Sequence, residues 1–222
     1  MIFKKLGKDF YVREDTVKIA RELLGKYLLT DIGGEGVTGG KIVETEAYLG
    51  AIDKASHGYG NKKTDRNKNL YKEGGHAYVY FIYGMYYLFN VVTGGKNFAD
   101  AVLIRALEPE IGLDTMTKRR NENKKNKTGG GRGKDNEIKR ITSGPGLLTI
   151  ALGIDLRHNG IPVCENRAWQ RSADLKIWLE DRNANIKDED VIETQRVGVD
   201  YAAEHSLLPY RFKIKGNIWV SR

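Results

Sequence analysis

The sequence predicts an α+β fold with a largely antiparallel sheet and helices beside it. Three observations support this prediction. Strand-like runs follow one another across the middle of the chain, the helical patterns are few and short, and there is no internal repeat. The chain has 222 residues, which fits one large domain or one domain with a mobile insert, and which can bury a sizeable core without disulfides or metal ions.

The chain begins with a helix and two strands. Asp15 can cap a helix that runs to Leu24, and Gly25 can end it. A strand is expected at residues 26–32, and a second, alternating strand at residues 41–49. One side of the second strand is expected to carry Ile42, Glu44, Glu46 and Tyr48, and the other side Val43, Thr45, Ala47 and Leu49.

A long polar loop and a hairpin follow. Residues 50–76 are rich in Gly, Asn and Lys, and connections of this length often carry function. Strands are expected at residues 77–81 and 86–92, around a turn in which Gly84 supplies the permissive backbone that a tight turn needs.

A basic segment interrupts the second half of the chain. A strand is expected at residues 101–107, and then a helix that begins at Pro109 and ends near Arg120. Residues 118–140 hold ten Lys or Arg residues against three acids, together with a run of three glycines. This composition predicts a basic, mobile insert rather than a domain boundary, so we expect one domain over residues 1–222.

The C-terminal part mixes helices and strands. Ser143 is expected to cap a helix that has Pro145 in its first turn and Gly153 after its end. A short helix is expected near residues 200–205. Strand-like runs occupy residues 176–179, 210–214 and 218–220.

The charge balance indicates a polyanionic partner. Lys and Arg number 37 against 29 Asp and Glu, a formal net charge of +8, which is typical of proteins that meet nucleic acid or an anionic membrane. The longest apolar stretch, residues 78–92, is too short and too rich in tyrosine to span a bilayer, so we expect no membrane partner. Cys164 is the only cysteine, which favours a reducing compartment and hence a cytoplasmic or nucleoid-associated location.

No metal or cofactor motif is present. The four histidines are far apart in sequence and lack ligand spacing, and the glycine run at residues 129–133 lacks the Lys-Ser/Thr end of a phosphate-binding loop. We therefore expect neither a metal nor a cofactor. Ser143-Gly144-Pro145-Gly146 is interpreted as a helix start rather than a nucleophile, and an anion site at that helix N-terminus stays an alternative.

Two groups of residues suggest chemistry on a flat ligand. Glu46 and Tyr48 share one side of a strand, where a carboxylate can act as a base beside a ring, although a surface pair is the more common case. Five tyrosines gather in the hairpin, at positions 78, 80, 83, 86 and 87. Tyr83, at the turn, could wedge between bases, and packing of the hairpin on a helix is the equal alternative.

These segments together resemble the alkyladenine (3-methyladenine) DNA glycosylase family, in family order along nearly the whole chain. The residues that carry the resemblance are Val43–Gly50, Ala55–Gly58, Thr64–Asn67, Tyr78–Tyr86, Asn90, Val102–Pro109, Ser143–Pro145, Arg196–Val199 and Trp219–Ser221. Asp65 departs from the proline that is usual in the Thr-x-Arg-Asn segment, and residues 118–140 are longer and more basic than in the family.

The resemblance implies a role for each of seven residues. Glu46 matches the general base that activates water, and Arg105 matches a residue that helps to place that water. Tyr83 matches the residue that intercalates into DNA. Tyr48, His57 and Tyr80 match the aromatic walls around a flipped base, and Asn90 matches the residue that discriminates against the guanine amino group. The family fold is one α+β domain with a curved antiparallel sheet, without a metal or a lysine nucleophile.

The expected function is hydrolysis of the N-glycosidic bond of alkylated or deaminated purines after base flipping, with a glutamate-activated water. The candidate lesions are 3-methyladenine, 7-methylguanine, hypoxanthine and ethenoadenine, and the expected partner of the monomer is duplex DNA that contains them. The alternative is a nucleic-acid-binding module without catalysis, which would not need Glu46. A lyase activity would need an amine nucleophile, and an acyl-transferring enzyme would need a His/Asp/Asn constellation that is not found.

Overall fold

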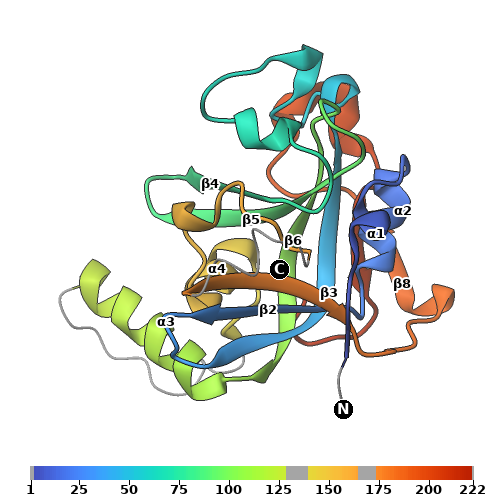
Figure 1. Ribbon diagram of the computed structural model, residues 1–222. Helices are drawn as coiled ribbons and strands as arrows, with labels where there is room; N and C mark the ends of the chain where they lie inside the picture. Colours follow the sequence, from blue (N-terminus) through green and yellow to red (C-terminus); the bar gives the residue numbers. More distant parts are fainter. Residues whose placement is uncertain (1–2, 129–139, 165–173, 222) are drawn as a thin grey trace.

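The computed structural model describes residues 3–128, 140–164 and 174–221, in which a twisted antiparallel sheet has helices on both sides (Figure 1). The strands are β1 (Lys4–Lys5), β2 (Tyr27–Ile32), β3 (Val37–Leu49), β4 (Ala77–Ile82), β5 (Tyr86–Thr93), β6 (Asp100–Ile111), β7 (Leu175–Asp181), β8 (Val191–Thr194) and β9 (Arg211–Ile214). The α-helices are α1 (Lys8–Tyr11), α2 (Thr16–Glu22), α3 (Leu113–Thr128) and α4 (Pro145–Leu152). Short 3-10 helices are η1 (Gly50–Ile52), η2 (Tyr59–Asn61), η3 (Lys68–Tyr71), η5 (Leu156–His158), η6 (Asp188–Asp190) and η7 (Asp200–Leu207).

The sheet is organised around the long strand β3. The strand order is β1-β7-β2-β3-β6-β5-β4. Strand β9 pairs with the second half of β3 on one side and with β8 on the other. All of these pairs are antiparallel. Figure 1 shows β3 turning from the direction of β2 to that of β6. The predicted α+β fold with a curved, antiparallel sheet is therefore confirmed.

Register shifts interrupt the pairing of β3 with β6. They lie between Gly39 and Gly40 and on both sides of Glu44. Around Glu44 the pairing skips Val43 on β3 and Arg105 on β6, so the strict alternation expected along this strand does not hold there. Such irregularities bend a strand and re-aim side chains, and they are frequent beside active sites.

Several expected helix ends are confirmed, and one cap is wrong. The Asp15 carboxylate accepts a hydrogen bond from the backbone N–H of Lys18 at 2.8 Å and caps α2. Pro145 begins α4, and Gly153 ends it in the left-handed conformation. Ser143 does not cap α4, because Gly144 occupies that position and the Ser143 hydroxyl instead donates to the carbonyl of Trp219 at 2.7 Å.

The helix expected to begin at Pro109 starts later. Pro109 lies within β6, opposite Gly40, where the register shift tolerates a residue without an N–H. The helix α3 begins at Leu113 and continues to Thr128. The prediction of a mobile loop is therefore wrong for residues 118–128. Met116 is fully buried, and Arg119 donates to Glu35, Thr38 and Ala151, which fixes the helix against the sheet and α4. Residues 129–139 of the expected insert lie outside the described residues.

The last expected strand is also wrong. Residues 218–220 form a turn, because the Asn217 side chain accepts from the N–H of Trp219 at 2.9 Å and the N–H of Val220 donates to the Asn217 carbonyl at 3.3 Å. The local bonds of an asparagine compete with strand pairing in this way. The strands expected at residues 176–179 and 210–214 are confirmed as β7 and β9, and the short helix expected near residues 200–205 is η7.

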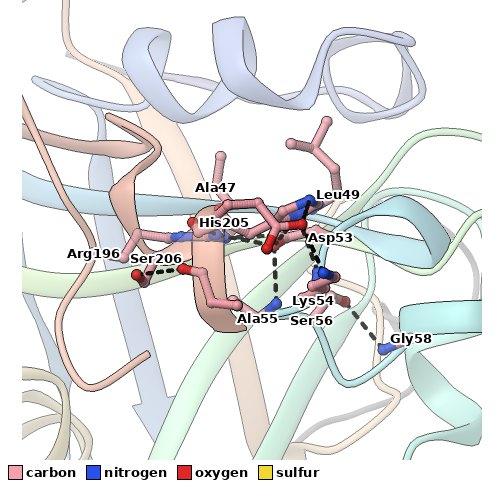
Figure 2. Close-up of polar contacts among 12 residues, drawn as sticks. Ala47, Leu49, Asp53, Lys54, Ala55, Ser56, Gly58, Arg196, His205 and Ser206 are labelled. Atoms are coloured by element: carbon pink, nitrogen blue, oxygen red, sulfur yellow. Dashed lines mark hydrogen bonds and ion pairs between the residues drawn. The ribbon is translucent and has the colours of Figure 1, made fainter. Parts of the chain in front are cut away.

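One buried ion pair joins the long loop after β3 to the C-terminal part (Figure 2). The Asp53 carboxylate accepts from both terminal nitrogens of Arg196 and from the backbone N–H of Leu49 and Ala55. Arg196 also donates to the carbonyl oxygens of Ala47, at 2.9 Å, and His205, at 3.1 Å. Burial alone would raise the pKa of Asp53, but Arg196 and these backbone donors outweigh it and lower the pKa. The pair thus fixes β3, the loop and η7 together.

The close approach of β3 to β6 gives a first prediction. A Cβ on Gly40 would overlap the carbonyl of Glu108, whereas Gly7 has open space around it. We expect Gly40→Ala to lower the free energy of unfolding by about 1–3 kcal/mol, because backbone must move, and Gly7→Ala to change it by less than about 1 kcal/mol. Urea denaturation measures both, and equal stabilities of the two variants would contradict this account of the bend.

The Asp53–Arg196 pair gives a second prediction. Asp53→Asn leaves a buried guanidinium without its counter-charge, which costs about 3–5 kcal/mol near pH 7. Because the folded protein lowers the pKa of Asp53, the wild-type advantage is present above the unfolded pKa, about 4, and is lost as the pH falls through the lower folded value. Denaturation of both proteins at several pH values measures this advantage. A difference that stays constant down to pH 2 would contradict it.

Candidate active site

A cavity of about 710 Å³ lies at one end of the sheet. It is bounded by the β4–β5 hairpin, the loop after β3, the first turn of α4 and residues 197–201. The size and the largely apolar, aromatic lining are typical of a pocket for a small or medium-sized flat ligand. Six of the seven site residues expected from the sequence line it, namely Tyr48, His57, Tyr80, Tyr83, Asn90 and Arg105.

The seventh expected residue, Glu46, lies directly behind the cavity wall. Its side chain is fully buried, and all three groups that hold it belong to residues that line the cavity. The Tyr48 hydroxyl donates to Oε2 at 2.8 Å, and the backbone N–H of Val197 donates to Oε1 at 2.8 Å. The Arg105 Nη1 lies 3.2 Å from Oε1. A buried carboxylate with two hydrogen-bond donors and an adjacent cation is stabilised despite its lack of solvent.

Arg105 lies between two carboxylates. It reaches Glu46 with Nη1 and Glu44 with Nε, which donates to Oε1 of Glu44 at 2.7 Å. Burial alone would lower the pKa of Arg105, but the charges of Glu46 and Glu44 outweigh it and raise the pKa. The guanidinium is therefore permanently charged, and it lines the cavity with 6 % of its surface exposed.

Three rings form one wall of the cavity. Tyr78 and Tyr80 share a side of β4, and the His57 Nδ1 lies 2.9 Å from the Tyr78 hydroxyl, with the His57 ring 4.6 Å from that of Tyr80. Burial, together with the nearby Arg66, lowers the pKa of His57, so that its ring is neutral near pH 7. Burial raises the pKa of Tyr78 to about 12, so that its hydroxyl keeps its proton. The wall is uncharged and aromatic.

Asn90 lies beside this wall. It is the cross-strand partner of Tyr78 on β5, and its Nδ2 donates to the Tyr78 carbonyl at 3.2 Å. Its side chain is buried apart from the part that faces the cavity. This hydrogen bond fixes the plane of the amide relative to any flat ligand in the cavity.

Tyr83 lies at the apex of the β4–β5 turn, as expected. It has a positive φ of 54°, followed by Gly84 with φ of 66°, and its side chain is 77 % exposed. The left-handed conformation costs a non-glycine residue about 1–2 kcal/mol. A large exposed ring in a strained turn beside a cavity does not serve stability, because it buries little surface.

The sequence analysis assigned no role to four other residues that shape the site. They are Val197, Asp53, Arg196 and Glu44. The Val197 contact uses a backbone N–H, which has no side-chain signature, although residues 196–199 carried part of the family resemblance. The other three act through partners distant in sequence, such as Asp53 and Arg196, which are separated by 143 residues.

Two further observations describe the chain around the site. Within the described ranges, no group of three or more His, Cys, Asp or Glu side chains is arranged to hold a metal ion. None of the helices in the same part of the chain is both long and apolar enough to cross a lipid bilayer.

Comparison with known proteins covers almost the whole chain. Residues 9–218 match the family model described as Methylpurine-DNA glycosylase (MPG). A Clostridium perfringens (strain 13 / Type A) protein is 44 % identical over 218 residues, which is 98 % of this chain and 99 % of that protein. A Clostridium novyi (strain NT) protein is 40 % identical over 225 residues, 99 % of each chain. Both carry the provisional name 3-methyladenine DNA glycosylase.

These matches extend over the cavity, the hairpin and the network around Glu46. Their length and identity confirm the resemblance found in the sequence. The chain belongs to the methylpurine-DNA glycosylase family.

Proposed function

We propose that this DNA glycosylase of base excision repair hydrolyses the N-glycosidic bond of alkylated or deaminated purines that have been flipped out of duplex DNA. The candidate lesions are 3-methyladenine, 7-methylguanine, hypoxanthine and ethenoadenine. The observation that carries the proposal is the buried Glu46 carboxylate, held by three residues that line an aromatic cavity. A protein that only binds DNA would not need a desolvated carboxylate at that position.

The cavity wall suits a damaged purine. An N-alkylated purine carries positive charge, and its contact with the face of a tyrosine such as Tyr80 contributes about 0.5–2 kcal/mol. Neutral purines still gain stacking, about 1–3 kcal/mol per base. Because burial lowers the pKa of His57, its ring is neutral and does not repel a cationic base. The wall therefore accepts both charged and neutral lesions.

Glu46 has two tasks in the proposed reaction. Departure of the base gives the sugar oxocarbenium character, and a nearby carboxylate both stabilises that cation and takes a proton from the attacking water. Arg105 helps to place the water, and its own pairing with Glu44 keeps it at the cavity wall. One carboxylate is sufficient, because a damaged purine is already a good leaving group.

Tyr83 and Asn90 would act before the chemical step. Flipping a nucleotide costs a few kcal/mol, least for damaged bases, and a ring inserted by Tyr83 would restack the duplex in its place. Asn90, held to the Tyr78 carbonyl, would reject a normal guanine by unfavourable contact with its exocyclic amine. The formal net charge of +8 favours approach to the phosphate backbone.

The role of Glu46 gives a third prediction. Glu46→Gln keeps the shape of the side chain but cannot accept the proton, so single-turnover base release is expected to fall by about 10²–10⁴-fold. The affinity for a duplex that contains hypoxanthine is expected to change by less than about threefold, or ~0.6 kcal/mol. Release of free base and fluorescence anisotropy measure the two quantities. Near-wild-type release by the variant would remove Glu46 from the reaction, whereas absence of release by the wild type would favour a protein that only binds nucleic acid.

The hairpin turn gives a fourth prediction. We expect Tyr83→Ala to weaken binding of lesion duplex more than binding of undamaged duplex, and to reduce the 2-aminopurine fluorescence change that reports flipping. Tyr59 is a matched control, since it is 46 % exposed on η2 and does not line the cavity. Unchanged flipping in Tyr83→Ala, or an equal loss in Tyr59→Ala, would count against a wedge at position 83.

A further inference from the structure

Two buried carboxylates share one guanidinium behind the cavity. Glu44 and Glu46 both lie on β3 and are fully buried, and Arg105 approaches them from β6. The Arg105 Nε donates to Glu44 Oε1 at 2.7 Å, whereas its Nη1 lies 3.2 Å from Glu46 Oε1. The shorter, charge-assisted bond therefore goes to Glu44, the carboxylate that does not hold Tyr48 or Val197.

The Glu44 carboxylate accepts three hydrogen bonds besides the one from Arg105. Its Oε1 also accepts from Arg211 Nε at 2.8 Å and from the Ser221 hydroxyl at 2.9 Å, and its Oε2 accepts from the Ser221 N–H at 2.6 Å. The donors come from β6, β9 and the C-terminal segment. Ser221 closes the network, because its hydroxyl also accepts from Arg105 Nη2 at 3.2 Å.

The local strand geometry supports this arrangement. The pairing of β3 with β6 shifts on both sides of Glu44, and there it skips Arg105 on β6. A residue freed from the ladder in this way can have its side chain re-aimed. Here the Arg105 side chain reaches both carboxylates and the cavity.

We propose that Glu44 is a positioning residue for base release: it anchors Arg105 so that the guanidinium supports Glu46 without forming a full bidentate pair with it. The proposal rests on the proposed function of Glu46. With Glu44 present, one guanidinium divides its donors between two carboxylates, and Arg211 balances the second negative charge. Without the charge of Glu44, Arg105 turns its Nε and a terminal nitrogen toward Glu46. The carboxylate that must accept a proton and face a cationic sugar is then neutralised.

Glu44 acts through Arg105 and not on the DNA. Glu44 is not among the residues that line the cavity, whereas Arg105 is. Loss of the Glu44 charge should therefore slow the chemical step and leave binding of the lesion intact. If the network served stability alone, its disruption would lower the melting temperature without changing the rate of base release relative to the affinity for the lesion duplex.

Glu44→Gln tests the proposal directly. We expect the single-turnover rate constant of hypoxanthine release to fall by about 10²-fold, since a displaced catalytic group has an effect of that size. The dissociation constant for the lesion duplex is expected to stay within about threefold of wild type. Glu180→Gln is the matched control, because Glu180 is also buried and accepts from Arg182 Nε at 2.7 Å and from Trp178 Nε1 at 3.0 Å, yet it lies on β7 outside the cavity lining. Its release rate should equal that of the wild type.

Ser221→Ala keeps the test decisive if Glu44→Gln does not fold. It removes the hydroxyl that joins Arg105 to Glu44 and leaves all charges paired, so we expect about a tenfold slower release with unchanged affinity. Wild-type release by the folded variants, or equal losses of rate and affinity, would overturn the role of Glu44. Glu46→Gln is assayed beside them. Its inactivity together with a wild-type rate for Glu44→Gln overturns only the positioning role. An active Glu46→Gln overturns the role of Glu46 on which the inference rests, and absence of release by the wild type overturns the proposed function itself.

Discussion

The need to supply bonding partners to a carboxylate that has no contact with solvent governs the arrangement of this protein. Glu46 is fully buried, so each of its hydrogen-bond partners must come from the chain. Tyr48 follows on the same strand, Arg105 reaches across from β6, and the backbone of Val197 arrives from a segment 151 residues away in sequence. Two of these partners are in turn fixed by buried ion pairs. Arg105 is held by Glu44, and the residue before Val197 is Arg196, which is held by Asp53.

These ion pairs account for the buried polar side chains that lie behind the aromatic wall of the cavity. Arg196 stacks 4.8 Å from the Tyr48 ring and bonds to the carbonyl of Ala47, so the same residue supports the strand that carries Glu46 and the loop that leads to His57. Buried ion pairs of this kind contribute little net stability compared with apolar packing, but they impose one geometry. The uncharged wall of Tyr78, Tyr80 and His57 and the exposed, strained turn at Tyr83 complete the cavity above these ion pairs.

Local sequence signals predicted the parts of this site that depend on local geometry. Alternation along β3 placed Glu46 and Tyr48 together, the tyrosine-rich hairpin with Gly84 placed Tyr83 at a turn, and Asp15 was recognised as a cap. Contacts between distant segments could not be predicted in this way. Pro109, a residue type that often begins a helix, lies in β6 at a register shift opposite Gly40. The Ser143 hydroxyl donates to the carbonyl of Trp219 instead of capping α4. The basic composition from residue 118 suggested a loop, but α3, packed through Met116 and Arg119, continues to Thr128.

A crystal structure with a duplex that contains an uncleavable purine nucleotide would test the central claim most directly. The account predicts that the base lies in the cavity against Tyr80 and His57, and that one water bridges the Glu46 carboxylate and the anomeric carbon. Such a water would lie between Tyr48, Arg105 and Val197, the three groups that hold Glu46 in the free protein. A base bound in the cavity with the Glu46 carboxylate still buried and with no water between it and the sugar would contradict the account.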